Sequence, residues 1–323
     1  MKKVLGLLIL VAVIVCIILL QQKNTLEDEM SNFSIENIDD VNQIYFADRM
    51  NNEVTLIKEN NSWMVDKEYP VRNEAIELLF STLEKMKIKY PVSESIHNSV
   101  IKELATQGVK LELYSGDESL MKTIYIGGET ADFLGTYMMI DGSEKAYVMH
   151  LPGFNGFLSP RFNIDGRKVT SQIWRSRKIF KGSMIDSLKM EFHDEPTKNF
   201  FLSTKESLII YGNNQKQKID SNSIKNYLNL IKTINCEGYV NDLESRDSIL
   251  TSEAVYTFTI YYTDKTSVKL NTFRKKWRHK TYITETQSQY DVDRLYGYNG
   301  SDFMLIQNYA FNPIFNPSLS VEK

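Results

Sequence analysis

Two basic stretches rich in aromatic residues are the parts of this sequence best suited to bind a partner. The first covers residues 150–182, where seven Arg and Lys residues and five aromatic residues accompany one acid, Asp165. Arginine and aromatic side chains together are typical of protein interfaces. The candidate contact residues are Arg161, Arg175, Arg177 and Lys178. The alternative is that the aromatic residues pack inside the protein while the arginines extend to water.

The second basic stretch covers residues 274–280, with the sequence RKKWRHK. It follows an expected strand and is interpreted as the tip of a hairpin. Trp277 and Arg278 are its candidate partner-binding residues. Contact with anionic lipid or with a protein partner is one interpretation, and an ordinary solvated turn is the other.

None of the common catalytic motifs occurs in the sequence. It lacks a Gly-x-Ser-x-Gly elbow, a phosphate-binding glycine loop, a dinucleotide fingerprint and a His-Glu-x-x-His pair. The four histidines are scattered, and none has ligand spacing with Cys236. We therefore expect no catalytic residue, no metal and no cofactor. A carboxylate pair that meets only in the fold stays open.

Length and charge restrict the organisation of the chain. Its 323 residues suggest about two domains. The net charge of −3 does not favour the binding of a polyanion, so no nucleic-acid partner is expected.

An apolar run at residues 4–20 predicts an uncleaved membrane anchor. It carries no charge, Lys2 and Lys3 precede it, and three acids follow at residues 27–29. This asymmetry predicts a cytoplasmic N-terminus and an exported remainder, as in a single-pass protein of the inner membrane with a periplasmic domain. A cleaved signal peptide is disfavoured because no small-x-small site follows the run. A buried core helix is the remaining alternative.

The exported part shows the same order of elements twice. Strand patterns precede an amphipathic helix at residues 74–87, and others precede a second helix at residues 222–234. Each apolar position of the second helix lies 148 residues after one in the first. We interpret this as an internal duplication, although any two amphipathic helices share such spacing. The predicted fold is α+β, with two tandem repeats of antiparallel sheet plus helix behind one transmembrane helix.

The expected boundaries follow from these patterns. They are an anchor at 1–23, a tether at 24–40, a first repeat at 41–150, a connector at 151–184, a second repeat at 185–312 and a tail at 313–323.

Several short motifs resemble the bacterial domain-of-unknown-function family 4340. They are the Trp63 strand, Tyr69-Pro70, Gly135-Thr136-Tyr137-Met138-Met139, Leu151-Pro152-Gly153-Phe154, Arg161-Phe162 and Trp174-Arg175-Ser176. The resemblance covers roughly residues 40–310. Related domains accompany a gliding-motility ABC transport system in some Gram-negative bacteria, so the resemblance implies an envelope role but assigns no catalytic residue.

We therefore expect a non-enzymatic envelope protein that binds or scaffolds a protein partner and is held in the bilayer by residues 4–20. An accessory of a transport or secretion complex fits this description. An envelope hydrolase with an unrecognised active site is the alternative.

Overall fold

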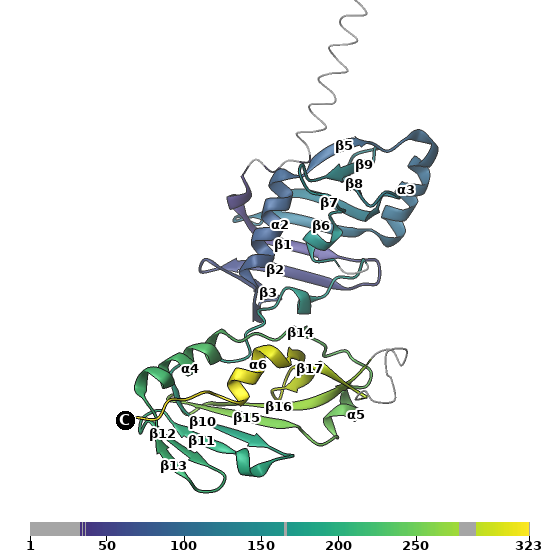
Figure 1. The fold of residues 1–323 in the computed structure, drawn as a ribbon. Helices are drawn as coiled ribbons and strands as arrows, with labels where there is room; N and C mark the ends of the chain where they lie inside the picture. Colours follow the sequence, from purple (N-terminus) through teal and green to yellow (C-terminus); the bar gives the residue numbers. More distant parts are fainter. Residues whose placement is uncertain (1–32, 34, 36, 165–166, 278–288, 323) are drawn as a thin grey trace, which may run out of the picture. The chain divides into compact units, whose positions relative to one another are not determined.

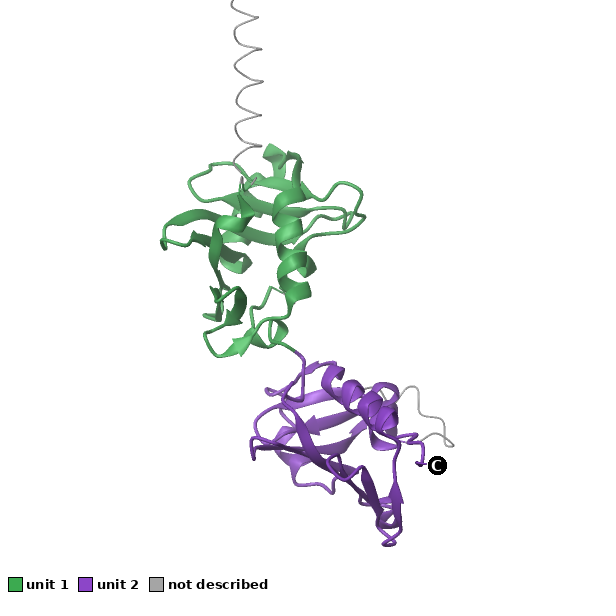
Figure 2. Ribbon diagram, turned by 90° about the vertical axis from the view of Figure 1, so that its left-hand side faces the viewer, with its two compact units in different colours: residues 1–176 green, residues 177–323 purple. Residues whose placement is uncertain are grey.

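The computed structural model describes residues 33, 35, 37–164, 167–277 and 289–322. Contacts between residues divide the chain into two compact units, residues 1–176 and 177–323 (Figure 2). Among the described residues, no helix is both long enough and apolar enough to cross a membrane. The apolar run at 4–20 lies outside the described residues.

The first unit is built on a nine-stranded antiparallel sheet with the order β4-β3-β2-β1-β6-β7-β8-β9-β5 (Figure 1). Its strands are β1 (Val41–Ala47), β2 (Glu53–Glu59), β3 (Ser62–Val65), β4 (Tyr69–Pro70), β5 (Lys87–Pro91), β6 (Val109–Ser115), β7 (Leu120–Glu129), β8 (Thr136–Ile140) and β9 (Tyr147–His150). Its helices are α2 (Asn73–Lys85) and α3 (Glu94–Gln107), with short 3-10 turns η1 (Ile38–Asp40), η2 (Ser159–Phe162) and η3 (Ser171–Ile173).

The second unit repeats this plan, with the order β13-β12-β11-β10-β15-β16-β17-β18-β14. Its strands are β10 (Ile185–Phe192), β11 (Phe200–Ser203), β12 (Leu208–Tyr211), β13 (Lys216–Lys218), β14 (Gly238–Tyr239), β15 (Tyr256–Tyr262), β16 (Ser267–Lys276), β17 (Tyr290–Tyr298) and β18 (Phe303–Gln307). Its helices are α4 (Ser221–Thr233), α5 (Arg246–Leu250) and α6 (Asn308–Phe315), with one 3-10 turn, η4 (Pro196–Lys198).

The two sheets share an order of elements and a register shift that the hydrophobic pattern alone does not determine. In each unit the chain makes four strands, a helix, a return strand at the far edge, a helix and four more strands. The first strand of each sheet carries a register shift near its start, between Val41 and Gln43 and between Ile185 and Ser187. The α+β class with two sheet repeats is confirmed, and this shared topology supports an internal duplication.

Equivalent helices bury equivalent stripes. Leu79 and Leu83 of α2 are fully buried in the core of the first unit. Tyr227 and Ile231 of α4 occupy the same helical positions and are buried in the core of the second unit. Because each stripe joins its own sheet to its own helix, each unit has a separate hydrophobic core.

The stretch expected to be a connector, residues 151–184, is divided between the units. Phe162 and Trp174 are fully buried in the first core, as expected for such aromatic side chains. Ile179 and Phe180 belong to the second core. Residues 313–323, expected to be a tail, are also part of the second unit, since α6 contributes Phe315 to its core.

A backbone bridge closes each unit at the same place. Val71, just before α2, bridges Arg175 at the end of the first unit. Ile219, just before α4, bridges Val321 at the end of the second. The residues that follow each sheet therefore return to the start of its long helix.

Candidate functional site: a cavity in the second unit

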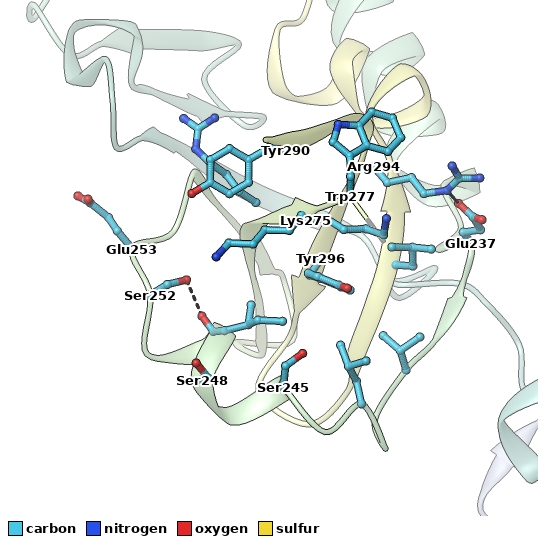
Figure 3. A pocket seen from close by; sticks show the side chains of 16 residues that line it. Glu237, Ser245, Ser248, Ser252, Glu253, Lys275, Trp277, Tyr290, Arg294 and Tyr296 are labelled. Atoms are coloured by element: carbon cyan, nitrogen blue, oxygen red, sulfur yellow. Dashed lines mark hydrogen bonds and ion pairs between the residues drawn. The ribbon is translucent and has the colours of Figure 1, made fainter. Parts of the chain in front are cut away.

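The second unit contains a cavity of about 980 Å³ beside its sheet (Figure 3). Strands β16, β17 and β18 form one side, and residues 240–253, which include α5, form the other. Trp277 and Tyr290 lie at one end, and Ser245 and Ser248 lie at the other (Figure 3). The aromatic, hydroxyl and charged side chains that line it are Trp277, Tyr290, Tyr296, Ser245, Ser248, Ser252, Glu237, Glu253, Arg274, Lys275, Lys276 and Arg294.

In the first unit a helix covers the equivalent face of the sheet. Tyr137 pairs with Val148 across β8 and β9, and both pack with Leu104 of α3. The pair at this position of the second unit is Tyr296 and Leu305, and both line the cavity. Because α5 has 5 residues where α3 has 14, the described residues of the second unit cover less of this face than those of the first.

One difference in residue type between the two repeats explains why a helix packs closely on the sheet in the first unit. At Gly127 on β7, an added Cβ would lie 2.8 Å from Cδ2 of Leu104. The corresponding residue on β16 is Phe273, which pairs with Tyr296 and is 4% exposed. The first repeat therefore needs glycine for the approach of α3, whereas the second fills the same place with its own phenyl ring.

Two carboxylates near the cavity are held as anions by cationic partners. Arg294 Nε lies 2.8 Å from Glu237 Oε2, and this hydrogen bond holds the pKa of Glu237 below its ordinary value despite partial burial. Burial raises the pKa of Asp291, but the hydrogen bond from Lys275 Nζ at 2.7 Å and a backbone hydrogen bond outweigh it and lower the pKa. Neither carboxylate is therefore poised for proton transfer near neutral pH.

The remaining cations lie nearer to solvent. Arg274 pairs with Asp194 at 2.6 Å and lies 5.6 Å from the centre of the Tyr290 ring. Lys276 and Trp277 are exposed. Aromatic faces, hydroxyl groups and partly neutralised charges suit stacking and hydrogen bonding to a polar ligand.

The structure separates the partner-binding candidates of the sequence. Trp277 lines the cavity, and Arg278 lies outside the described residues. Arg177 is half-buried and Lys178 is exposed at the start of the second unit, and neither is among the lining residues. The main chain of Lys178 bridges Asn235.

The other two candidates, Arg161 and Arg175, belong to the first unit. Arg161 Nε donates a hydrogen bond to Thr82 Oγ1 at 2.9 Å and is half-buried. Arg175 is 6% exposed, and its guanidinium lies 3.5 Å from the centre of the Tyr69 ring. The expectation that the arginines beside Trp174 extend to water is therefore wrong for Arg175, because it stacks on Tyr69 within the fold.

Several residues around the cavity are not among the candidates predicted from the sequence. Tyr290, Arg294 and Tyr296 come from β17, which was not predicted. Their even spacing places them on one face of a strand, a signal present in the sequence but weakened by the charged residues between them. Ser245 and Ser248 could not have been found, because only the fold brings residues 240–253 over β16 to β18.

Within the described ranges, no group of three or more His, Cys, Asp or Glu side chains could hold a metal ion. The single cysteine there, Cys236, is free and buried.

Comparison with known proteins connects the chain to one family. The family model described as "Domain of unknown function (DUF4340)" matches residues 62–253, from β3 of the first unit to the residues before β15 of the second. No curated protein and no solved structure gave a match. The match spans the boundary between the units and more than half of the chain, so this protein belongs to the DUF4340 family.

Proposed function

We propose that this protein is a membrane-anchored, extracytoplasmic binding module whose second unit takes a partner or ligand into the cavity beside β16 to β18. The observation that carries the proposal is the difference between the repeats. One topology occurs twice, but the face covered by α3 in the first unit borders a cavity in the second, where the described residues include only the short α5. The sheet face that α3 covers in the first repeat is therefore available to a bound partner or ligand in the second.

The chemistry around the cavity supports binding more than hydrolysis. Glu237 and Asp291 are ionised and paired with cations, so they are weak general acids and bases. Aromatic side chains such as Trp277 and Tyr296 offer flat apolar faces beside hydrogen-bonding groups, a common arrangement at binding sites. An envelope hydrolase is the second candidate; it would need an acid and a base that converge on one point.

A photo-crosslinking amino acid at Trp277 tests the cavity in cells. Trp277 is 38% exposed and lines the cavity. Tyr261 is the matched control, because it is an aromatic residue of the same unit, 40% exposed, and not among the lining residues. We expect crosslinked species from position 277 and none from position 261. Equal crosslinking at both positions, or none at 277, would contradict the proposed site.

The membrane part of the proposal rests on the charge asymmetry around residues 4–20. A reporter fused after residue 323 should be active outside the cytoplasm, and the mature chain should retain residues 1–20. A mature N-terminus near Gln21, or a reporter active only in the cytoplasm, would overturn the anchor.

A further inference from the structure

Two neighbouring loops of the first unit expose a cluster of apolar side chains. The loop between β7 and β8 carries Phe133 and Leu134, which are 57% and 43% exposed. The loop after β9 carries Phe154, 38% exposed, and Phe157, whose ring centre lies 6.2 Å from that of Phe133. We call these four residues the aromatic tip. Exposed aromatic residues that cluster on loop ends commonly mark an interaction site.

The first of these loops is built to hold its apolar side chains outward. The backbone N–H of Thr130 donates a hydrogen bond across it to the carbonyl of Gly135 at 3.0 Å, and the Asp132 carboxylate accepts one from the backbone N–H of Leu134 at 3.0 Å. Phe133 has a φ of +58°, a conformation that is uncommon for a bulky residue. The hydrogen bonds therefore fix an exposed phenyl ring in a strained backbone, where a smaller polar residue would fit more easily.

Cationic side chains accompany the aromatic tip. Lys89 Nζ donates a hydrogen bond to the carbonyl of Leu134 at 3.3 Å and lies 3.8 Å from the acid Asp132. The guanidinium of Arg161 lies 5.2 Å from the centre of the Phe154 ring. Aromatic rings with flanking Lys and Arg are characteristic of protein surfaces that contact the headgroup layer of a bilayer.

The tip is also close to where the N-terminal segment meets the unit. Phe33 is buried and packs edge to face against Tyr147 at the start of β9, with ring centres 5.6 Å apart. The four residues of β9 span roughly 13 Å before the second loop begins. Twelve residues separate Leu20 from Phe33, and they reach at most about 40 Å. A bilayer that holds residues 4–20 is therefore within reach of the tip.

We propose that the aromatic tip inserts into the headgroup region of the anionic bilayer that holds the N-terminus, and so fixes one orientation of the first unit. This inference rests on the proposed membrane anchor. A bilayer fits better than a protein partner, because four side chains offer far less than the roughly 800 Å² per partner of a stable protein interface. Weak insertion suffices once the anchor keeps the tip at a high effective concentration near the surface.

Depth-dependent quenching of tryptophan tests this in the full-length protein. A Phe133→Trp variant would be reconstituted in vesicles of phosphatidylethanolamine and phosphatidylglycerol that contain brominated lipid, with the parent chain subtracted for its three tryptophans. Leu120→Trp is the control, because Leu120 is 55% exposed and lies at the other end of the same strand, β7. We expect at least twofold quenching at position 133 and a blue-shifted emission, with neither at position 120.

The outcomes separate the inference from the proposed anchor. If the chain does not sediment with the vesicles at all, the anchor fails. If it sediments but Trp at 133 is unquenched, or is quenched no more than Trp at 120, the aromatic tip does not touch lipid. An emission that shifts with protein concentration rather than with lipid would mean that a second copy covers the tip, and this also overturns the inference.

Discussion

Alanine at equivalent positions of the two long helices should destabilise one unit at a time. Leu83 of α2 and Ile231 of α4 are both 0% exposed, and each belongs to a different core. Either substitution removes three buried carbons, worth about 0.8 kcal/mol each, and leaves a cavity that costs about 1 kcal/mol more. We expect Leu83→Ala and Ile231→Ala each to cost about 3 to 4 kcal/mol in the free energy of unfolding of its own unit.

Calorimetry on the full-length protein measures this selectivity. At roughly 2 to 4 °C per kcal/mol for domains of this size, each variant should lower one melting transition by about 10 °C. The other transition should stay in place, because the two units have separate cores. Leu120→Ala, at a residue 55% exposed, is the control and should change stability by less than about 0.5 kcal/mol. If either core variant lost less than about 1 kcal/mol of its free energy of unfolding, or if both melting transitions shifted equally, the assignment of two equivalent cores would be refuted.

Two further predictions concern charged residues. Arg175→Ser should lower the melting temperature of the first unit because it removes the stack on Tyr69, whereas Arg177→Ser, at a half-buried residue, should change it much less; equal effects in thermal melts would contradict this. The pKa of Asp291 is lowered in the fold, so its pairing with Lys275 stabilises the protein above about pH 4 and is lost as pH falls through the folded pKa. Urea unfolding measures this. Between pH 5 and pH 3 the free energy of unfolding should fall less in Asp291→Asn than in the parent protein, and at pH 7 it should be about 3 kcal/mol lower in the variant than in the parent.

Helices and meanders could be predicted from the sequence because their signals are local. The apolar stripes that include Leu83 and Ile231 predicted both long helices to within two residues at either end. The residue that caps a helix is harder to predict. In α4, Asp220 accepts the capping hydrogen bond from the backbone of Ser223, at 2.8 Å, and its neighbour Ser221 is also of a residue type that commonly caps helices. Short polar residues in a row offer several equivalent caps, and only the geometry of the chain before the helix selects one.

The return strands could not be predicted in this way. β5 and β14 lie at the far edge of each sheet, next to β9 and β18, and are separated from these partners by long stretches of chain. β5 reads KIKYP and shows no clear alternation, because an edge strand needs little burial. The cavity could not be predicted either, because its two sides are distant in the chain. The sequence indicates Trp277 and its basic neighbours as candidates, but only the fold brings α5 opposite β17.

Composition does not show where the side chains of the connector point. The interpretation in which its aromatic residues pack inside the protein holds for Trp174, which is fully buried, but Arg175 is also nearly buried instead of extending to water. The Tyr69 ring on which Arg175 stacks supplies part of the compensation for burying its charge.

The bridges that close each unit allow the first unit to fold before the second has been synthesised. The first unit is complete once Arg175 is available to pair with Val71, and the second unit begins only at residue 177. Strands of the two sheets, which share a topology and could exchange partners, therefore need not be unfolded at the same time. Vectorial synthesis keeps the duplicated sheets from mispairing, a hazard of tandem repeats that refold from the fully unfolded chain.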